Sequence, residues 1–102
     1  MTVNPDHVSR PYDIAELVAD PEVAQAFLDE IVADGDPHEI AEAIGMVARA
    51  QGMTKLAGEA GMSRESLYRA LSANGNPTLS TLLAVLKALG FKLSGVERIS
   101  PA

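Results

Sequence analysis

The chain has 102 residues, of which 47% are hydrophobic, and its formal net charge is −6. This length fits one domain, and the lack of cysteine excludes disulfides and thiolate metal sites. No stretch approaches the roughly 20 apolar residues that a membrane span needs, and the N-terminus lacks the apolar run of a secretion signal, so we expect a soluble cytoplasmic protein.

The charge is unevenly divided along the chain. Residues 1–50 contain eleven acids and two bases, whereas residues 51–102 contain three acids and six bases. Such an asymmetry indicates that the two halves meet different partners.

The first part of the chain predicts an arm followed by three helices. Residues 1–12 have two prolines and little periodicity, which favours a flexible arm. A short helix is expected at residues 13–20, capped by Asp13, and helices at 21–34 and 37–51 each open with an Asp-Pro pair in which Asp is the cap. The predicted inward face of the short helix consists of Ile14, Leu17 and Val18. The predicted apolar residues of the next helix are Val23, Ala24, Phe27, Leu28, Ile31 and Val32. Those of the third are Ile40, Ala43, Ile44, Val47 and Ala48.

The second part predicts three more helices and a short strand. Thr54 is expected to cap a helix at 55–60. Ser63 is expected to cap a further helix, whose Leu67 and Leu71 side chains face the core. Thr78 is expected to cap the last helix, which Gly90 ends. Its predicted apolar stripe is Leu79, Leu82, Leu83, Leu86 and Leu89. Residues 91–96 alternate between apolar and polar, which is typical of a strand, and a lone strand needs a partner, such as the same segment of a second subunit.

The predicted fold is therefore all-α, a five- to six-helix bundle in which a short C-terminal strand is the one other element. We expect a single helical domain over 13–98, with an acidic helical lobe at 13–52, a helix-turn-helix lobe at 53–96 and a tail at 99–102. Residues 91–96 and the last helix are the predicted dimer surface.

Residues 53–72, MTKLAGEAGMSRESLYRALS, have the spacing of a helix-turn-helix. Ala57 is small enough for a close helix crossing, Gly61 is free to take a positive φ in the turn, and Leu67 anchors the second helix in the core. Ser63 caps that helix and leaves its first turn exposed, and this turn is the part that enters the major groove of DNA. The alternative is a plain helical hairpin inside a bundle.

Arg64 and Arg69 are the leading candidates for contact with DNA bases or phosphates. Arginine can donate two hydrogen bonds to guanine, at O6 and N7, and Glu65 can accept a hydrogen bond from cytosine N4. The alternative is a solvated helix face with a weak Glu65–Arg69 ion pair. Helix starts and loop amides can bind phosphate, although simple capping is the favoured role for Thr78. The full predicted DNA-binding set is Thr54, Lys55, Ser63, Arg64, Glu65, Ser66, Tyr68, Arg69, Asn74, Asn76 and Thr78.

The overall acidity does not exclude DNA binding. Electrostatic attraction to phosphate decays over about 10 Å at ordinary salt, so an acidic lobe turned away from the groove weakens binding without abolishing it. One module with few bases binds weakly, and we expect a homodimer that reads half-sites about 34 Å apart.

No catalytic or metal site is predicted. His7 and His38 are far apart, and neither has acids at a metal-ligand spacing. There is no glycine-rich phosphate loop after a strand, and Ser63 and Ser66 lack a nearby base. We therefore expect no enzyme, no metal and no cofactor.

The tract GMSRESLYRALSANGNPTLSTLLAVLKALGFKL resembles the C-terminal half of HigA-like addiction-module antidote proteins, a branch of the lambda-repressor/Xre helix-turn-helix group. The preceding ADPEVAQAFLDEIVADGDPHEIAEAIGMVARAQGMTKLA resembles their N-terminal helices, so the resemblance covers about residues 12–96. Ala70 departs from the pattern, since a larger apolar residue is commoner there, and Leu71 can fill that volume. The family motif residues that this resemblance assigns to DNA are Ser63, Arg64, Glu65, Ser66, Tyr68 and Arg69.

The resemblance implies a cytoplasmic antitoxin that binds a small basic toxin of the RelE/ParE type and represses its own operon as a dimer. The acids of residues 13–42 would then face the basic toxin. On the residues alone, the favoured explanation is a solvated helix face that keeps the protein soluble, and only with the resemblance do the two explanations stand level. Two other functions stay open, namely a DNA-binding regulator without a toxin partner, and a protein-interaction module that does not bind DNA.

Overall fold

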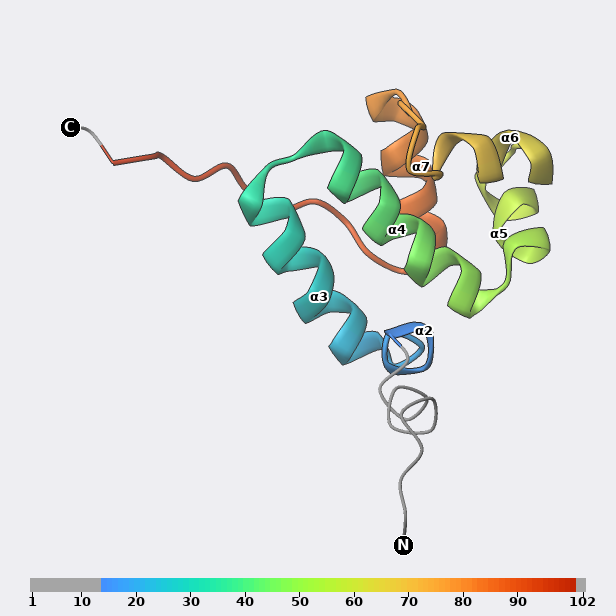
Figure 1. Cartoon of the computed structure of the whole chain (residues 1–102), viewed down its shortest axis with the longest axis horizontal. Coiled ribbons are helices and arrows are strands. Elements are labelled where there is room, and N and C mark those ends of the chain that lie inside the picture. The colour runs from blue at the N-terminus through green and yellow to red at the C-terminus, as the bar shows by residue number, and fades with distance from the viewer. Residues whose placement is uncertain (1–13, 101–102) are drawn as a thin grey trace, which may run out of the picture.

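Figure 1 shows a bundle of helices in a computed structural model that describes residues 14–100. Within these residues there are six helices and no strand, which confirms the predicted all-α fold. The helices are α2 (Ile14–Leu17), α3 (Pro21–Asp34), α4 (Pro37–Gln51), α5 (Met53–Ala60), α6 (Arg64–Ala70) and α7 (Leu79–Leu89). The expected arm at 1–12 and the cap at Asp13 lie outside the described residues.

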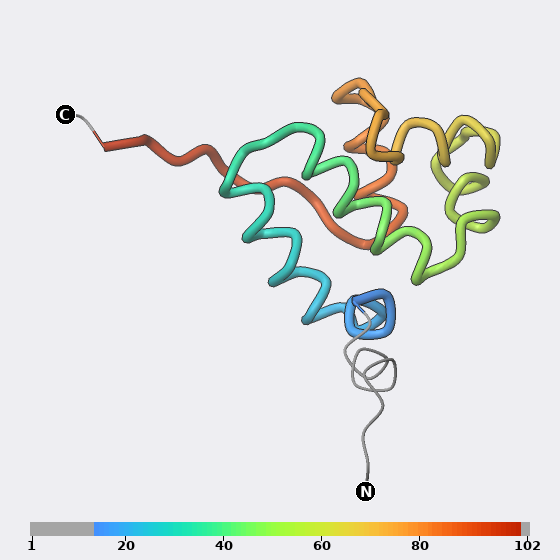
Figure 2. Tube along the Cα trace, in the orientation of Figure 1, coloured from blue at the N-terminus to red at the C-terminus, as the bar shows by residue number. Residues whose placement is uncertain are grey.

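Helix α4 is the centre of the bundle, and it packs against α2, α3, α5 and α7. Most of its buried side chains are small, so neighbouring helices approach it closely on several sides. These buried residues are Ala41, Ala43, Ile44, Gly45, Val47 and Ala48. The tube in Figure 2 shows α3 and α4 as an antiparallel pair, with α5 and α6 at the far end of α4 from the α3–α4 turn. Helices α5 and α7 pack on each other and complete the core.

The two Asp-Pro openings behave as the sequence predicted. One carboxylate oxygen of Asp20 accepts from the backbone N–H of Glu22 at 2.8 Å, and one of Asp36 accepts from that of His38 at 2.9 Å. Proline loses no hydrogen bond at the first helical position, because that N–H has no partner within the helix. Helices α3 and α4 therefore begin and end at the predicted residues.

The predicted cap at Thr54 is wrong. Helix α5 begins at Met53, so Thr54 lies inside its first turn, and Gly52 occupies the cap position without any side-chain hydrogen bond. Gly52 has φ 112° and ψ 111°, which allows an abrupt change of direction between α4 and α5. Burial of Met53 draws it into the helix directly after the glycine.

Two predicted apolar faces are only partly buried. In α2 the side chains of Ile14 and Leu17 are exposed, and it is Val18, just after the helix, that enters the core. In α7 the first part of the leucine stripe is exposed at Leu79 and Leu83. The buried residues of α7 are Val85, Leu86 and Leu89, of which Val85 was not predicted. Packing against α4 and α5 covers only the C-terminal part of α7.

The strand expected at residues 91–96 is absent from the described chain. After α7, the N–H of Phe91 donates to the Leu86 carbonyl at 2.8 Å, and residues 91–100 then run without secondary structure. No other strand lies within residues 14–100 to pair with this segment, and an isolated strand cannot satisfy its own backbone groups. Residues 91–95 line a groove together with residues of α3, α4 and α7, and in Figure 2 the segment leaves the body near the α3–α4 turn.

A close contact between α4 and the end of α6 was not predicted. A Cβ atom built on Gly45 would lie 2.6 Å from the carbonyl oxygen of Leu71 and 3.2 Å from its Cβ. The backbone of Leu71, the C-cap residue of α6, therefore lies directly against α4, and only glycine at position 45 leaves room for it.

We expect Gly45→Ala to destabilise the protein by about 1–3 kcal/mol, because the new methyl group meets backbone that cannot rotate away. Thermal unfolding followed by circular dichroism measures the change, with a lower Tm expected. Gly58→Ala is the matched control, since a Cβ atom at this position would meet nothing within 4 Å and its φ is not positive. Alanine favours the helix there by about 0.5–1 kcal/mol. A Tm for Gly45→Ala at or above that of the Gly58→Ala control contradicts the packing argument.

Candidate nucleic-acid interface

Helices α5 and α6 are joined by a tight turn at Gly61 and Met62. Gly61 has φ 72°, and the N–H of Met62 donates to the Ala57 carbonyl at 2.9 Å. Ala57 and Leu67 are both buried, as the predicted close helix crossing requires. The left-handed conformation at Gly61 lets α6 leave at an angle from α5.

Ser63 fixes the start of α6. Its hydroxyl oxygen accepts from the Ser66 N–H at 3.0 Å, and its O–H donates to the Ser66 hydroxyl oxygen at 2.8 Å. This cap satisfies one of the free amide groups at the helix start. The predicted cap at Ser63 is confirmed, and so is the cap at Thr78, whose hydroxyl accepts from the Thr81 N–H at 3.1 Å.

Arg64 stacks on Tyr68 one turn further along α6. The guanidinium carbon lies 5.3 Å from the centre of the Tyr68 ring, and one guanidinium nitrogen donates to its hydroxyl at 3.5 Å. Both side chains are exposed. Guanidinium groups stack well on aromatic faces, so the ring holds Arg64 extended along the outer side of α6 while most of its N–H donors stay available. The i, i+4 spacing was the signal that could have predicted this pair.

A shallow notch lies between α6 and the loop that follows it. The notch is about 410 Å3 in volume and is lined by Ser66, Arg69, Ala70, Ser72, Asn74, Gly75 and Asn76. It brings together four of the predicted DNA-binding residues, which are Ser66, Arg69, Asn74 and Asn76. Ser72, whose hydroxyl donates to the Arg69 carbonyl at 2.9 Å, was not predicted.

Gly75 shapes this notch. A Cβ built on it would lie 2.6 Å from the Arg69 carbonyl oxygen and even closer to that of Ala70. Its N–H donates to the Ser72 carbonyl at 2.9 Å. The loop therefore folds tightly against the end of α6, and Asn74 and Asn76 line the same notch as Arg69.

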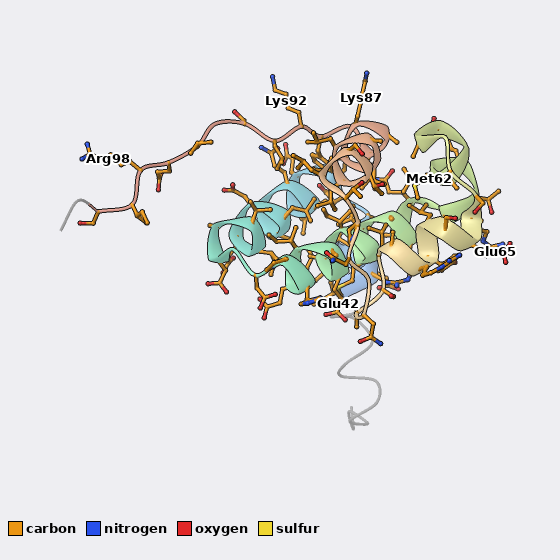
Figure 3. All side chains as sticks on the ribbon, turned by 90° about the horizontal axis from the view of Figure 1, so that it is seen from above. Glu42, Met62, Glu65, Lys87, Lys92 and Arg98 are labelled. Atoms are coloured by element: carbon orange, nitrogen blue, oxygen red, sulfur yellow. The ribbon has the colours of Figure 1, made fainter. Side chains whose placement is uncertain are left out.

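The other predicted residues lie outside the notch. Thr54 and Lys55 are exposed in the first turn of α5, and Thr78 is exposed at the start of α7. Glu65 lies at one end of the molecule in Figure 3, far from Arg98 in the C-terminal segment. Of the eleven predicted residues only Ser66 is half-buried, and the other ten are exposed.

The charges are separated in space as well as in sequence. Residues 14–48 carry nine acids and no arginine or lysine, and all nine acids are exposed. These acids belong to α2, α3, the first part of α4 and the segments that join them. Figure 1 shows α3 on the opposite side of α4 from α5 and α6, so α3 and its carboxylates do not cover the outer face of α6.

Within residues 14–100 no group of three or more His, Cys, Asp or Glu residues is arranged to hold a metal ion. In the same part of the chain, no helix has the length and apolar character to cross a membrane.

Comparison with known proteins identifies the family of this chain. The model of a family described as "Probable addiction module antidote protein" matches residues 8–97. An uncharacterized protein of Haemophilus influenzae is 42% identical over 83 residues, which is 81% of this chain and 86% of the relative. No solved structure matches the chain significantly. The family match spans the acidic helices, the α5–α6 unit and most of the segment after α7, and on this ground the chain belongs to the family of probable addiction module antidote proteins.

Proposed function

We propose that this protein is the antitoxin of a toxin–antitoxin module and that it represses its own operon by binding DNA through α6 as a homodimer. Membership of the antidote family supports the antitoxin role. The observation that carries the DNA-binding role is the exposure of Arg64 and Arg69 on a helix whose start is capped and whose outer face is free of the acidic helices.

The residues of α6 and the notch divide between base and phosphate contacts. Arg64 lies in the first turn of α6, which is the part of a recognition helix that reaches base edges, and Glu65 is its acceptor neighbour there. Arg69, Asn74 and Asn76 converge on the notch and offer a cation and two amides to one backbone phosphate. In this proposal Ser63 and Thr78 act mainly as caps, which leaves free backbone amides at two helix starts.

The acidic helices supply the antitoxin role in this proposal. A surface with nine acids and no lysine or arginine attracts a basic partner and raises its rate of capture. The resemblance to HigA-like antidotes implies a small basic toxin of the RelE/ParE type. Covering that toxin's basic surface would block its access to RNA. If no such toxin exists, the same acids are a solvated surface and the protein is a DNA-binding regulator alone.

Single arginine substitutions test the DNA contact. We expect Arg64→Ala and Arg69→Ala each to weaken operator binding by about 1–3 kcal/mol, or roughly fivefold to 150-fold. The double variant is expected to abolish the band shift with the protein's own promoter. Fluorescence anisotropy over a salt series measures both the affinity and the number of phosphate contacts.

Lys87→Ala is the matched control, since it removes one positive charge from an exposed site on α7 that Figure 3 shows on another side of the molecule from Glu65. Its affinity is expected to stay close to that of the unmodified protein. If the double arginine variant binds the operator normally, the contact assignment is wrong. If the unmodified protein gives no shift at all, the protein-interaction function is favoured instead.

Co-expression with the product of the neighbouring gene tests the antitoxin role. A small basic protein is expected to co-elute with this chain in size-exclusion chromatography. We expect Glu30→Gln with Glu42→Gln to slow association with that protein by about tenfold at low salt, because exposed charges act mainly on the association rate. Surface plasmon resonance measures the rate.

Glu59→Gln with Glu65→Gln is the matched control, as it makes the same change of charge on α5 and α6. Equal slowing in both double variants would mean that overall charge, rather than the acidic lobe, attracts the toxin. Operator binding without any co-eluting partner favours a regulator that has no toxin.

A further inference from the structure

The segment after α7 exposes three large apolar side chains. Leu93, Val96 and Ile99 have relative exposures of 48%, 102% and 89%. They recur at every third residue of a segment that has no regular secondary structure. Residues 92–100 donate no backbone hydrogen bond to the rest of the described chain. The two large apolar side chains at the end of this segment, Val96 and Ile99, are therefore uncovered.

A groove of about 300 Å3 lies beside the start of the same segment. Its helical walls come from α3, α4 and α7, and residues 91–95 complete it. The helix residues that line it are Gln25, Leu28, Asp29, Val32, Ile44 and Leu86. Four of these six side chains are aliphatic, so the groove is an apolar slot with polar groups at its margin.

The groove and the end of the segment are complementary in charge as well as in polarity. The groove has one acid, Asp29, and one base, Lys92. The end of the segment has one acid, Glu97, and one base, Arg98. They lie between the exposed side chains of Val96 and Ile99. An incoming segment can therefore pair Arg98 with Asp29 while its valine and isoleucine enter the slot.

We propose that residues 96–99 of one copy of this protein dock in the groove of a second copy, and that the exchange is reciprocal. The contact is isologous, so it closes after two copies. The inference rests on the homodimer of the proposed function and assigns its interface.

The direction of the segment favours a second copy over the same chain. Residues 91–95 already form a wall of the groove, and Figure 1 shows the chain beyond them leaving the body instead of folding back over it. Figure 3 places Arg98 and Glu65 at opposite ends of the molecule. An exchange at the Arg98 end therefore leaves the outer face of α6 free for DNA in both copies.

Cross-linking between engineered cysteines tests the exchange, and the natural chain has no cysteine to interfere. A full-length Val32→Cys chain is mixed with a full-length Val96→Cys chain under oxidised glutathione, which takes up the two electrons and two protons as the disulfide forms. We expect an interchain disulfide dimer in non-reducing gels. A Thr54→Cys chain mixed with the Val96→Cys chain is the control, and no cross-link is expected since no residue of α5 lines the groove.

The Val32→Cys, Val96→Cys double variant distinguishes the two occupants. If this single chain forms an internal disulfide and stays monomeric at low concentration, the segment folds back on itself and the proposal is overturned. Failure of the two-chain mixture to cross-link also overturns it.

Equilibrium sedimentation gives an independent measure. We expect Val96→Ser with Ile99→Ser to raise the dimer dissociation constant at least about a hundredfold, since four apolar side chains per dimer are lost. Asp29→Arg is expected to weaken the dimer, and Arg98→Asp in the same chain to restore it. Leu79→Ser with Leu83→Ser is the control, as these exposed leucines lie on α7.

Each outcome separates this inference from the proposed function. If the α7 variant becomes monomeric while the tail variant stays dimeric, the interface is on α7 and the exchange is wrong, whereas the homodimer stands. If the exchange is found but the unmodified chain does not bind its operator, the proposed DNA-binding function fails and the exchange stands.

Discussion

The structure depends on the close approach of Leu71, the residue that follows α6, to α4. The carbonyl oxygen of Leu71 rests where a side chain at position 45 would lie, and the buried Leu71 side chain enters the core beside it. This contact fixes α6 against the helix that also supports α2 and α3, so the acidic helices and the exposed arginines are held in one rigid arrangement. Small residues along α4 make that arrangement possible, because their lack of volume lets helices approach on several sides.

This rigid packing matters for the charges because it holds the acidic groups apart from the arginines of α6. Nine carboxylates on a flexible arm would reach α6 and compete with phosphate for Arg64 and Arg69. Most of them are instead carried by helices packed on α4, so their field at the outer face of α6 is weakened by distance and by salt. An acidic protein can thus present a locally basic helix, and two partners of opposite charge can approach it from different sides.

The sequence predicted correctly those features of the fold that depend on interactions between nearby residues. The caps at Asp20, Asp36, Ser63 and Thr78, and the left-handed glycine at Gly61, depend on hydrogen bonds within a few residues, and all are confirmed. The start of α5 was wrong because burial of Met53, a tertiary effect, outweighed the capping preference of Thr54. The close backbone contacts at Gly45 and Gly75 depend on how α6 packs in the folded protein. Spacing in the sequence therefore could not predict them. The predicted DNA contacts stay predictions, although the structure leaves their side chains accessible.

The position of the C-terminal segment relative to α6 also bears on the proposed function. Two arginines on one α6 give few phosphate contacts, and affinity for DNA rises steeply when a dimer doubles them. A segment that exposes Val96 and Ile99 and leaves the body at the end opposite Glu65 can join two copies without covering the outer face of α6 in either copy. Association through this end would set the separation of the two α6 helices by the length of the body, and hence the spacing of operator half-sites. In a tail-exchanged dimer, operator geometry is therefore a consequence of where Val96 and Ile99 dock.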